Sequence, residues 1–137
     1  MVNKLTAAVA RALNGAFGDG YAIYQNEVPQ GSKRPCFFLG AQEPRVKPLL
    51  GRRFRLEAPM DIRLFPEAEG DNHALMAAAE TALAALRMVE LENGDLVRGS
   101  GLDCRVADGV LHVAVTYGMV LVEDAEAEMM EELMVVK

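Results

Sequence analysis

The sequence has few of the residues on which catalysis and metal binding depend. Its 137 residues include two cysteines and two histidines. Neither His73 nor His112 has a second histidine, a cysteine or a carboxylate at metal-ligand spacing, so we expect both to be structural. No phosphate-binding loop, dinucleotide-binding, serine hydrolase or zinc protease motif occurs. We therefore expect no catalytic residue, no metal and no cofactor, and interpret the chain as a non-enzyme.

Cys36 and Cys104 both lie in apolar runs that resemble strands. Free cysteines in such runs usually behave as small hydrophobic residues, and a disulfide is the less favoured interpretation. A nucleophilic Cys36 would need exposure and a basic neighbour. Arg34 is two residues away, but the apolar residues 37–39 indicate a buried strand. We predict that both cysteines are buried, reduced and dispensable for function.

Long hydrophobic runs are also missing. No run reaches the roughly 20 residues of a membrane span, and residues 1–15 lack the continuous apolar stretch of a signal peptide. We expect no membrane partner and a cytoplasmic site of synthesis. The hydrophobic fraction of 51% with 25% charged residues is typical of a folded globular protein, and the length predicts one domain, 1–137.

The charge is negative overall but unevenly distributed. A net charge of -6 disfavours nucleic-acid binding as the main role. Cationic residues nevertheless crowd the middle of the chain and acidic residues its end, so we predict an electrostatically two-sided subunit. The cationic group is Lys33, Arg34, Arg45, Lys47, Arg52, Arg53, Arg55 and Arg63, and the acidic group is Glu123, Asp124, Glu126, Glu128, Glu131 and Glu132.

Helical spacing of apolar residues predicts three helices. The first covers residues 2–16. The second is capped by Asp71 or Asn72 and continues to about Leu91. The acidic segment 124–135 is predicted to form a short third helix that needs a partner surface to be ordered, because an isolated helix of this length is marginal.

Between the helices, alternating and aromatic-rich runs predict strands. Residues 21–28 and 35–42 are two short candidates. Apolar and charged residues alternate almost completely over 54–64, which predicts a strand with one buried face. Pro59 lacks a backbone donor and is therefore expected to mark a bulge or an edge.

The second half of the chain is predicted to be a meander. Asn93-Gly94 and Asp108-Gly109 are two-residue hairpin signals, and residues 110–123 alternate again. The whole pattern predicts an α+β fold: a single domain with a mainly antiparallel mixed sheet flanked by helices, in the order α-β-β-β-α-β-β-β-α.

The segment "EPRVKPLLGRR", residues 43–53, is predicted to be a loop stiffened by Pro44 and Pro48. It places apolar Val46, Leu49 and Leu50 among cationic residues. Exposed apolar residues in a basic frame usually indicate a protein contact. The alternative is that the two leucines fold back onto the core of their own subunit.

Three stretches in order, "VPQGSKRPCFFLG", "PLLGRRFRLEAPMDIRLFP" and "DGVLHVAVTYG", carry a family resemblance. From about Tyr21 to Tyr117 the chain resembles the tail terminator (tail completion) proteins of long-tailed phages, prophages and phage-tail-like particles. Leu64 stands where the family pattern has an aromatic residue. The positions that correspond to the family pattern, Leu64 included, are Val28, Gln30, Pro35, Cys36, Phe37 and Phe38, then Asp61, Ile62, Leu64, Phe65 and Pro66, then Leu111, His112, Val115 and Tyr117.

The resemblance implies a hexameric ring that binds the last ring of the tail tube, stops its polymerisation and lets the head dock. The implied partners are other copies of the chain, the tail tube protein and a head-completion or sheath protein, with DNA only passing through the lumen. The implied location is the virion tail or a tail-like particle, after assembly in the host cytoplasm. The alternatives are a head-side connector ring and, less favoured, a small enzyme or ligand-binding domain without a visible site.

A head-to-tail ring joins two different surfaces of each subunit, and the basic middle and acidic end would be complementary. We therefore expect these regions at a subunit or tube interface, with the carboxylates of the end turned toward the Arg-rich segment of a neighbouring subunit. The expected interface residues are Arg45, Val46, Lys47, Leu49, Leu50, Arg52, Arg53, Glu128, Glu131 and Glu132.

Overall fold

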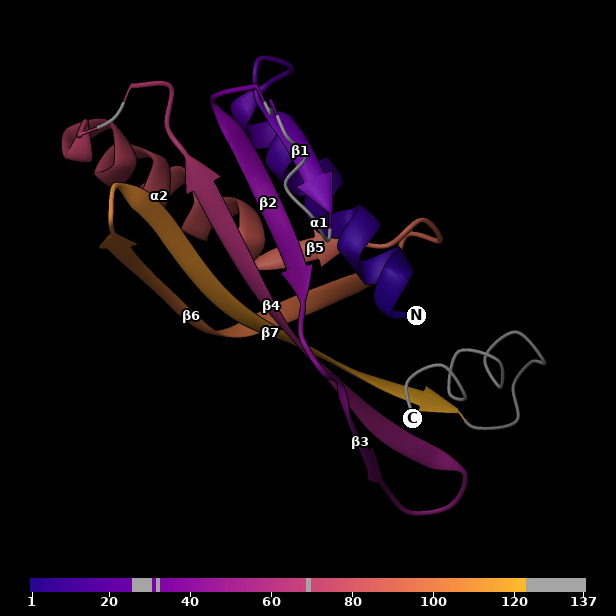
Figure 1. Cartoon of the computed structure of the whole chain (residues 1–137). Coiled ribbons are helices and arrows are strands. Elements are labelled where there is room, and N and C mark those ends of the chain that lie inside the picture. Colours follow the sequence, from indigo (N-terminus) through magenta and orange to yellow (C-terminus); the bar gives the residue numbers. More distant parts are fainter. Residues whose placement is uncertain (26–30, 32, 69, 123–137) are drawn as a thin grey trace.

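The computed structural model describes residues 1–25, 31, 33–68 and 70–122. They form one α+β domain, which confirms the predicted fold class (Figure 1). The predicted helix over 124–135 lies outside the described residues. In chain order the elements are α1 (Val2–Phe17), β1 (Ala22–Gln25), β2 (Cys36–Ala41), β3 (Arg45–Pro48), β4 (Arg53–Phe65), α2 (Asn72–Leu86), β5 (Met88–Glu90), β6 (Leu96–Ala107) and β7 (Val110–Val122).

The strands form one mixed sheet in the order β1-β2-β4-β7-β6-β5, with β3 paired to β4. The β1–β2 pair is parallel, and the other pairs are antiparallel. The β6–β7 hairpin turns at Asp108 and Gly109, whose positive φ angles of 53° and 74° suit a two-residue hairpin turn, as predicted. Figure 1 shows that the sheet curls and that α1 and α2 lie behind the same face.

Strand β4 is the centre of the sheet. Its predicted alternation is confirmed, since every second side chain from Phe54 to Leu64 is buried. Along one edge β4 pairs with β7 over almost its whole length. Its other edge is shared, because residues 54–57 pair with β3 and residues 60–65 pair with β2.

Part of the predicted loop 43–53 is therefore a strand. β3 has no buried side chain. Its four residues, Arg-Val-Lys-Pro, alternate over a run too short to distinguish a strand from a loop, and the proline argues against a strand. It lies at an edge of the sheet, where it pairs with β4. Pro48 ends the strand, a position at an edge where a missing donor is tolerated.

The expectation for Pro59 is wrong, because this residue lies in the central strand, opposite Thr116 of β7, in a continuous register. The carbonyl of Pro59 accepts a hydrogen bond from the backbone N–H of Gln42 at 3.0 Å. The nitrogen and carbonyl of a strand residue point to the same side. The missing donor therefore faces the interval between β2 and β3 and removes no bond from the β4–β7 ladder.

The helix ends agree with the sequence in part. α1 ends before Gly18, whose φ is 86°, and α2 begins after Asp71, whose side chain accepts a hydrogen bond from the N–H of Ala74 at 3.0 Å. α2 stops at Leu86, short of the expected end at Leu91. The apolar spacing in the sequence continues past Leu86 because Val89, which belongs to β5, is also buried against the core.

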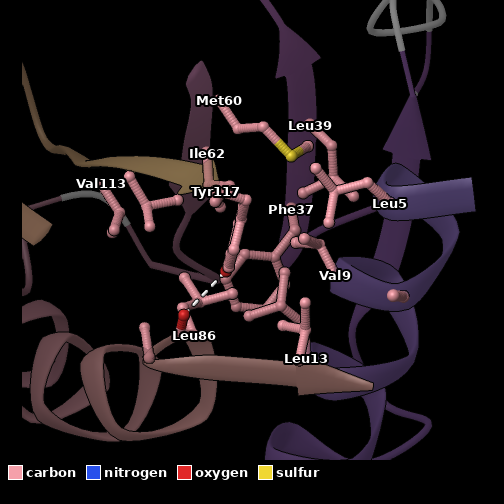
Figure 2. Packing of buried hydrophobic residues seen from close by; sticks show 14 of the residues in the cluster. Leu5, Val9, Leu13, Phe37, Leu39, Met60, Ile62, Leu86, Val113 and Tyr117 are labelled. Atoms are coloured by element: carbon pink, nitrogen blue, oxygen red, sulfur yellow. Dashed lines mark hydrogen bonds between the residues drawn. The ribbon is translucent and has the colours of Figure 1, made fainter. Parts of the chain in front are cut away.

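The core lies between the two helices and the face of the sheet that they cover. Figure 2 shows side chains from both layers pointing toward one another. Tyr117 is fully buried, and its hydroxyl donates a 2.7 Å hydrogen bond to the carbonyl oxygen of Leu86. This bond fixes β7 to the last turn of α2. The labelled residues are Leu5, Val9, Leu13, Phe37, Leu39, Met60, Ile62, Leu86, Val113 and Tyr117.

Both cysteines are free. Cys36 is buried as predicted, but it lies on the opposite side of β2 from Phe37 and outside the core cluster. Cys104 is half-buried at the margin of the core. Burial raises the pKa of both thiols, and nearby Asp103 raises that of Cys104 further, while Arg34 opposes the increase at Cys36. Both side chains therefore favour the neutral, unreactive thiol at physiological pH.

Candidate assembly interface

The β3–β4–β7 end of the sheet extends away from the two helices (Figure 1). We call this part the distal ribbon: β3, the turn 49–52, residues 53–57 of β4 and residues 118–122 of β7. The turn is closed by a 2.9 Å hydrogen bond from the N–H of Leu49 to the carbonyl oxygen of Arg53. Gly51 has a φ of 73° there, a conformation that favours glycine.

The two faces of the distal ribbon differ in chemistry. One face carries the buried side chains of Phe54 and Leu56. The opposite face, here called the cationic face, places Lys47 opposite Arg55, and Arg55 opposite Val120. Cross-strand register puts the following side chains on the cationic face: Arg45, Lys47, Arg53, Arg55, Glu57, Val120 and Val122.

Charges on the cationic face are only partly compensated. The Nε atom of Arg55 lies 3.3 Å from Oε1 of Glu57, in a pair open to solvent. Within the part of the chain that the structure describes, Arg45, Lys47 and Arg53 form no ion pair. Like charges directly opposite on a sheet repel. The face is therefore suited to an acidic partner.

Gly118 shapes this face. A Cβ atom at Gly118 would lie 2.7 Å from Nη2 of Arg55 and 3.3 Å from its Cζ. The glycine therefore lets the guanidinium group of Arg55 rest against the backbone of β7. The same guanidinium remains within reach of Glu57 on its own strand.

Apolar side chains are exposed at the tip of the ribbon. Leu50 is 84% exposed, and Leu49 and Val46 are 39% and 44% exposed. None of the three belongs to the core cluster, so the alternative that the two leucines fold back onto the core is wrong. Val120 and Val122 add exposed apolar area on the cationic face. Such a concentration on a protruding element is typical of a protein contact.

The structure brings together seven of the predicted interface residues on β3, the turn and the start of β4: Arg45, Val46, Lys47, Leu49, Leu50, Arg52 and Arg53. The other three, Glu128, Glu131 and Glu132, lie outside the described residues. Sequence reasoning missed Arg55, Val120 and Val122. The two valines lie at positions of β7 that face away from Tyr117, where alternation would place polar residues. Their apolar side chains were a signal of a second apolar surface.

A groove of about 670 Å³ lies between α1 and the β5 region. Its arginine, Arg11, donates a 2.8 Å hydrogen bond to the backbone carbonyl of Glu90 and so connects α1 to β5. Across the described part of the chain, no three His, Cys, Asp or Glu side chains are close enough to hold a metal ion. Neither helix there is long and apolar enough to cross a membrane.

The model of the phage tail terminator protein family matches residues 4–129. The chain belongs to this family. A phage tail terminator is a structural assembly protein, so this chain acts in phage tail assembly, in the virion tail, through contacts with other tail or head proteins. The match confirms the resemblance found in the sequence.

No curated protein matches the chain. One solved structure without a descriptive name has 17% sequence identity, covers 85% of this chain and 94% of its own, and gives a TM-score of 0.35. A TM-score this low gives no information about the role of the phage tail terminator.

Proposed function

We propose that the protein is a non-enzymatic assembly protein that forms a hexameric ring at the head-proximal end of the tail tube. The ring stops tube polymerisation and provides the surface to which the head is joined. The observation that carries this proposal, together with family membership, is the distal ribbon. It projects exposed apolar side chains, with Leu50 at 84%, from a cationic frame, as a protein-binding element would.

In this proposal each subunit uses two different surfaces. The distal ribbon contacts another subunit or the tube protein, and the acidic end with Glu128, Glu131 and Glu132 contacts another subunit. Repetition of such a head-to-tail contact closes a ring. Assembly takes place in the host cytoplasm, with head-completion or sheath proteins as further partners. DNA only passes through the lumen, and the net charge of -6 suits passage because it offers the polyanion no overall attraction.

Native mass spectrometry and tube binding test this function. We expect a species with the mass of six copies, alone or on addition of tube protein, and shorter tubes when the protein is present during tube polymerisation. A protein that stays monomeric and leaves tube length unchanged would contradict the proposal. Binding to a portal complex instead of the tube would identify a head-side connector.

Replacement of Leu49 and Leu50 by Ser tests the tip of the ribbon. Because both side chains lie outside the core, the subunit should fold with a Tm within a few degrees of the wild type, as expected for surface substitutions of about 0.5 kcal/mol or less. Ring formation or tube binding should weaken by about tenfold or more, since apolar anchors at an interface contribute at least about 1.4 kcal/mol.

The matched control is Met76→Ser on α2, where the side chain is 60% exposed on another part of the surface. This variant should assemble as the wild type does. Unfolding of the double leucine variant would show that the tip belongs to the subunit core, and normal assembly would show that the tip contacts no partner.

A further inference from the structure

We propose that the cationic face of the distal ribbon binds the acidic C-terminal segment, residues 123–137, of a neighbouring copy of the chain. This inference rests on the proposed ring and names the contact that closes it. The partner is thus a second copy of this chain, and the recognised chemistry is a polypeptide rich in carboxylates and in apolar side chains.

Among the described residues of its own subunit, the cationic face has more cations than carboxylates. It carries four cations, Arg45, Lys47, Arg53 and Arg55, and one carboxylate, Glu57. Arg55 is paired with that carboxylate at 3.3 Å, and the other three cations form no ion pair with a described residue. Lys47 and Arg55 are direct cross-strand neighbours, so an acidic segment laid across them would relieve repulsion as well as form new ion pairs.

The C-terminal segment has the complementary composition. It contains six carboxylates and one cation, Lys137. Apolar side chains follow the first carboxylates, and these would be unfavourably exposed to water if the segment were only a solvated acidic tail. They match Val120 and Val122, which are 51% and 43% exposed on the cationic face. The carboxylates are Glu123, Asp124, Glu126, Glu128, Glu131 and Glu132, and the apolar residues include Met129, Met130, Leu133 and Met134.

The position of the end of β7 favours a neighbouring copy over the same subunit. Val122 lies opposite Arg53, at the free end of the ribbon. To reach its own cationic face, the chain would have to reverse directly after Val122. Apart from Asp124, residues 123–137 contain none of the Gly, Pro, Asn and Ser residues that favour tight turns. Their Glu, Ala, Met and Leu content favours a helix over a turn.

The reach of the segment agrees with a contact between copies. As a helix, residues 123–137 would extend about 20 Å at 1.5 Å per residue. A helix of this length that continued in the direction of β7 would carry the carboxylates beyond the end of their own ribbon. The ribbon and the segment are different surfaces. Each copy can therefore bind one neighbour through its ribbon and the other neighbour through its segment. Repetition of that exchange produces a closed ring.

Two full-length charge-reversed variants test the contact. The ribbon variant carries Arg45→Glu, Lys47→Glu and Arg53→Glu. The segment variant carries Glu128→Lys, Glu131→Lys and Glu132→Lys. Each variant alone should be a folded subunit whose association is weakened by about a hundredfold, because every contact in its ring would join like charges.

Mixing the two variants separates a contact between copies from one within a subunit. The wild-type segment of the first variant fits the wild-type ribbon of the second, and the two reversed surfaces also fit each other. The mixture should therefore form rings in which the variants alternate, as a ring with an even number of subunits permits. Isotope labelling of one variant and native mass spectrometry of the mixture would show equal numbers of both.

The outcomes distinguish this inference from the proposed ring. If each reversed variant alone forms rings as well as the wild type does, the proposed ring stands and this contact is overturned. A mixture that stays monomeric, while one chain with all six substitutions assembles, would show that the segment binds its own ribbon and would also overturn it. If the wild-type chain forms no rings, the proposed ring is wrong. Association of the two mixed variants as pairs would still support the contact in that case.

Two further variants control for charge and for folding. Arg105→Glu changes an exposed arginine at the far end of the same sheet face, opposite His112, and should assemble as the wild type does. If the reversed ribbon does not fold, Gln at positions 45, 47 and 53 removes the charges without adding repulsion. That variant should weaken association at low salt, and unchanged association would overturn the proposal.

Discussion

Tyr117 joins the central sheet to the end of α2 through a single side chain. Its hydroxyl lies 2.7 Å from the carbonyl oxygen of Leu86, and the residue is fully buried. Burial of this hydroxyl raises the pKa of the phenol well above its usual value of 10.0. The buried carbonyl of Leu86, at the end of a helix, depends on this donor because no intrahelical N–H follows it.

Replacement of Tyr117 by Phe should lower the free energy of unfolding by about 1–3 kcal/mol, because it leaves a buried carbonyl without its donor. Urea denaturation at pH 7 measures this change. The core shape is kept, so the variant should remain folded and cooperative. An unchanged free energy of unfolding would show that the hydrogen bond contributes no net stability.

The same variant should respond less to alkaline pH. The unfolded chain releases the phenol proton near pH 10, the usual value, while the folded protein keeps it because its pKa is raised. The stabilising effect is therefore present below about pH 10 and is lost as the pH rises above it. Urea denaturation of both proteins between pH 9 and 11 should show the steeper loss in the wild type.

At the scale of elements, Gly99 is a point of close contact between β6 and the end of α2. Its N–H donates a 2.8 Å hydrogen bond to the carbonyl of Arg87, and it lies opposite Tyr117. A Cβ atom there would be 2.7 Å from Cγ2 of Val115 and 2.9 Å from the carbonyl oxygen of Leu86. Any side chain would push the helix end away from the sheet.

Gly99→Ala should therefore lower the free energy of unfolding by about 1–3 kcal/mol through overpacking. Thermal denaturation, read by circular dichroism, measures the loss. Gly20→Ala is the control, since a Cβ atom there meets no atom within 4 Å. Equal Tm values for the two variants would show that α2 and β6 accommodate the added Cβ atom without a loss of stability.

Elements with one buried face could be predicted from the sequence. β4 and β7 alternate because one side of each faces the core, and the side chain of Asp71 identified the start of α2. β3 has no buried side chain, and its four residues, preceded by Pro44 and ended by Pro48, alternate too briefly to distinguish a strand from a loop. The predicted end of α2 was wrong because Val89 is buried in the core from a strand, at a position that also fits the helical spacing.

The candidate interface could be predicted only in part for a similar reason. Residues 45–53 are close in sequence, so their shared chemistry is visible without a fold. Arg55 and Val120 become neighbours only through the register of β4 against β7. A pairing between strands this far apart in the chain depends on the whole sheet, and no local signal fixes it.

At the scale of the whole molecule, charge steering should make assembly depend on salt. Replacement of Glu128, Glu131 and Glu132 by Gln should weaken ring formation more at low salt than at high salt. Salt already screens such attraction over a Debye length of about 8 Å at physiological ionic strength. Sedimentation velocity at several salt concentrations measures the difference. Assembly equal to the wild type at every concentration would show that the acidic end only solubilises the protein.

The pairing of β4 with β7 also determines when the molecule can fold. Phe54 pairs with Leu121 and Leu64 with Leu111, so the central ladder joins residues from the middle and the end of the described chain. Such non-local contacts slow folding because a long loop must close before they form. During synthesis β4 waits with one edge unpaired until the ribosome has released β7. Nascent copies made close together on one messenger therefore carry open strand edges at the same time, and completion of the hairpin at Asp108 and Gly109 is the step that ends this exposure.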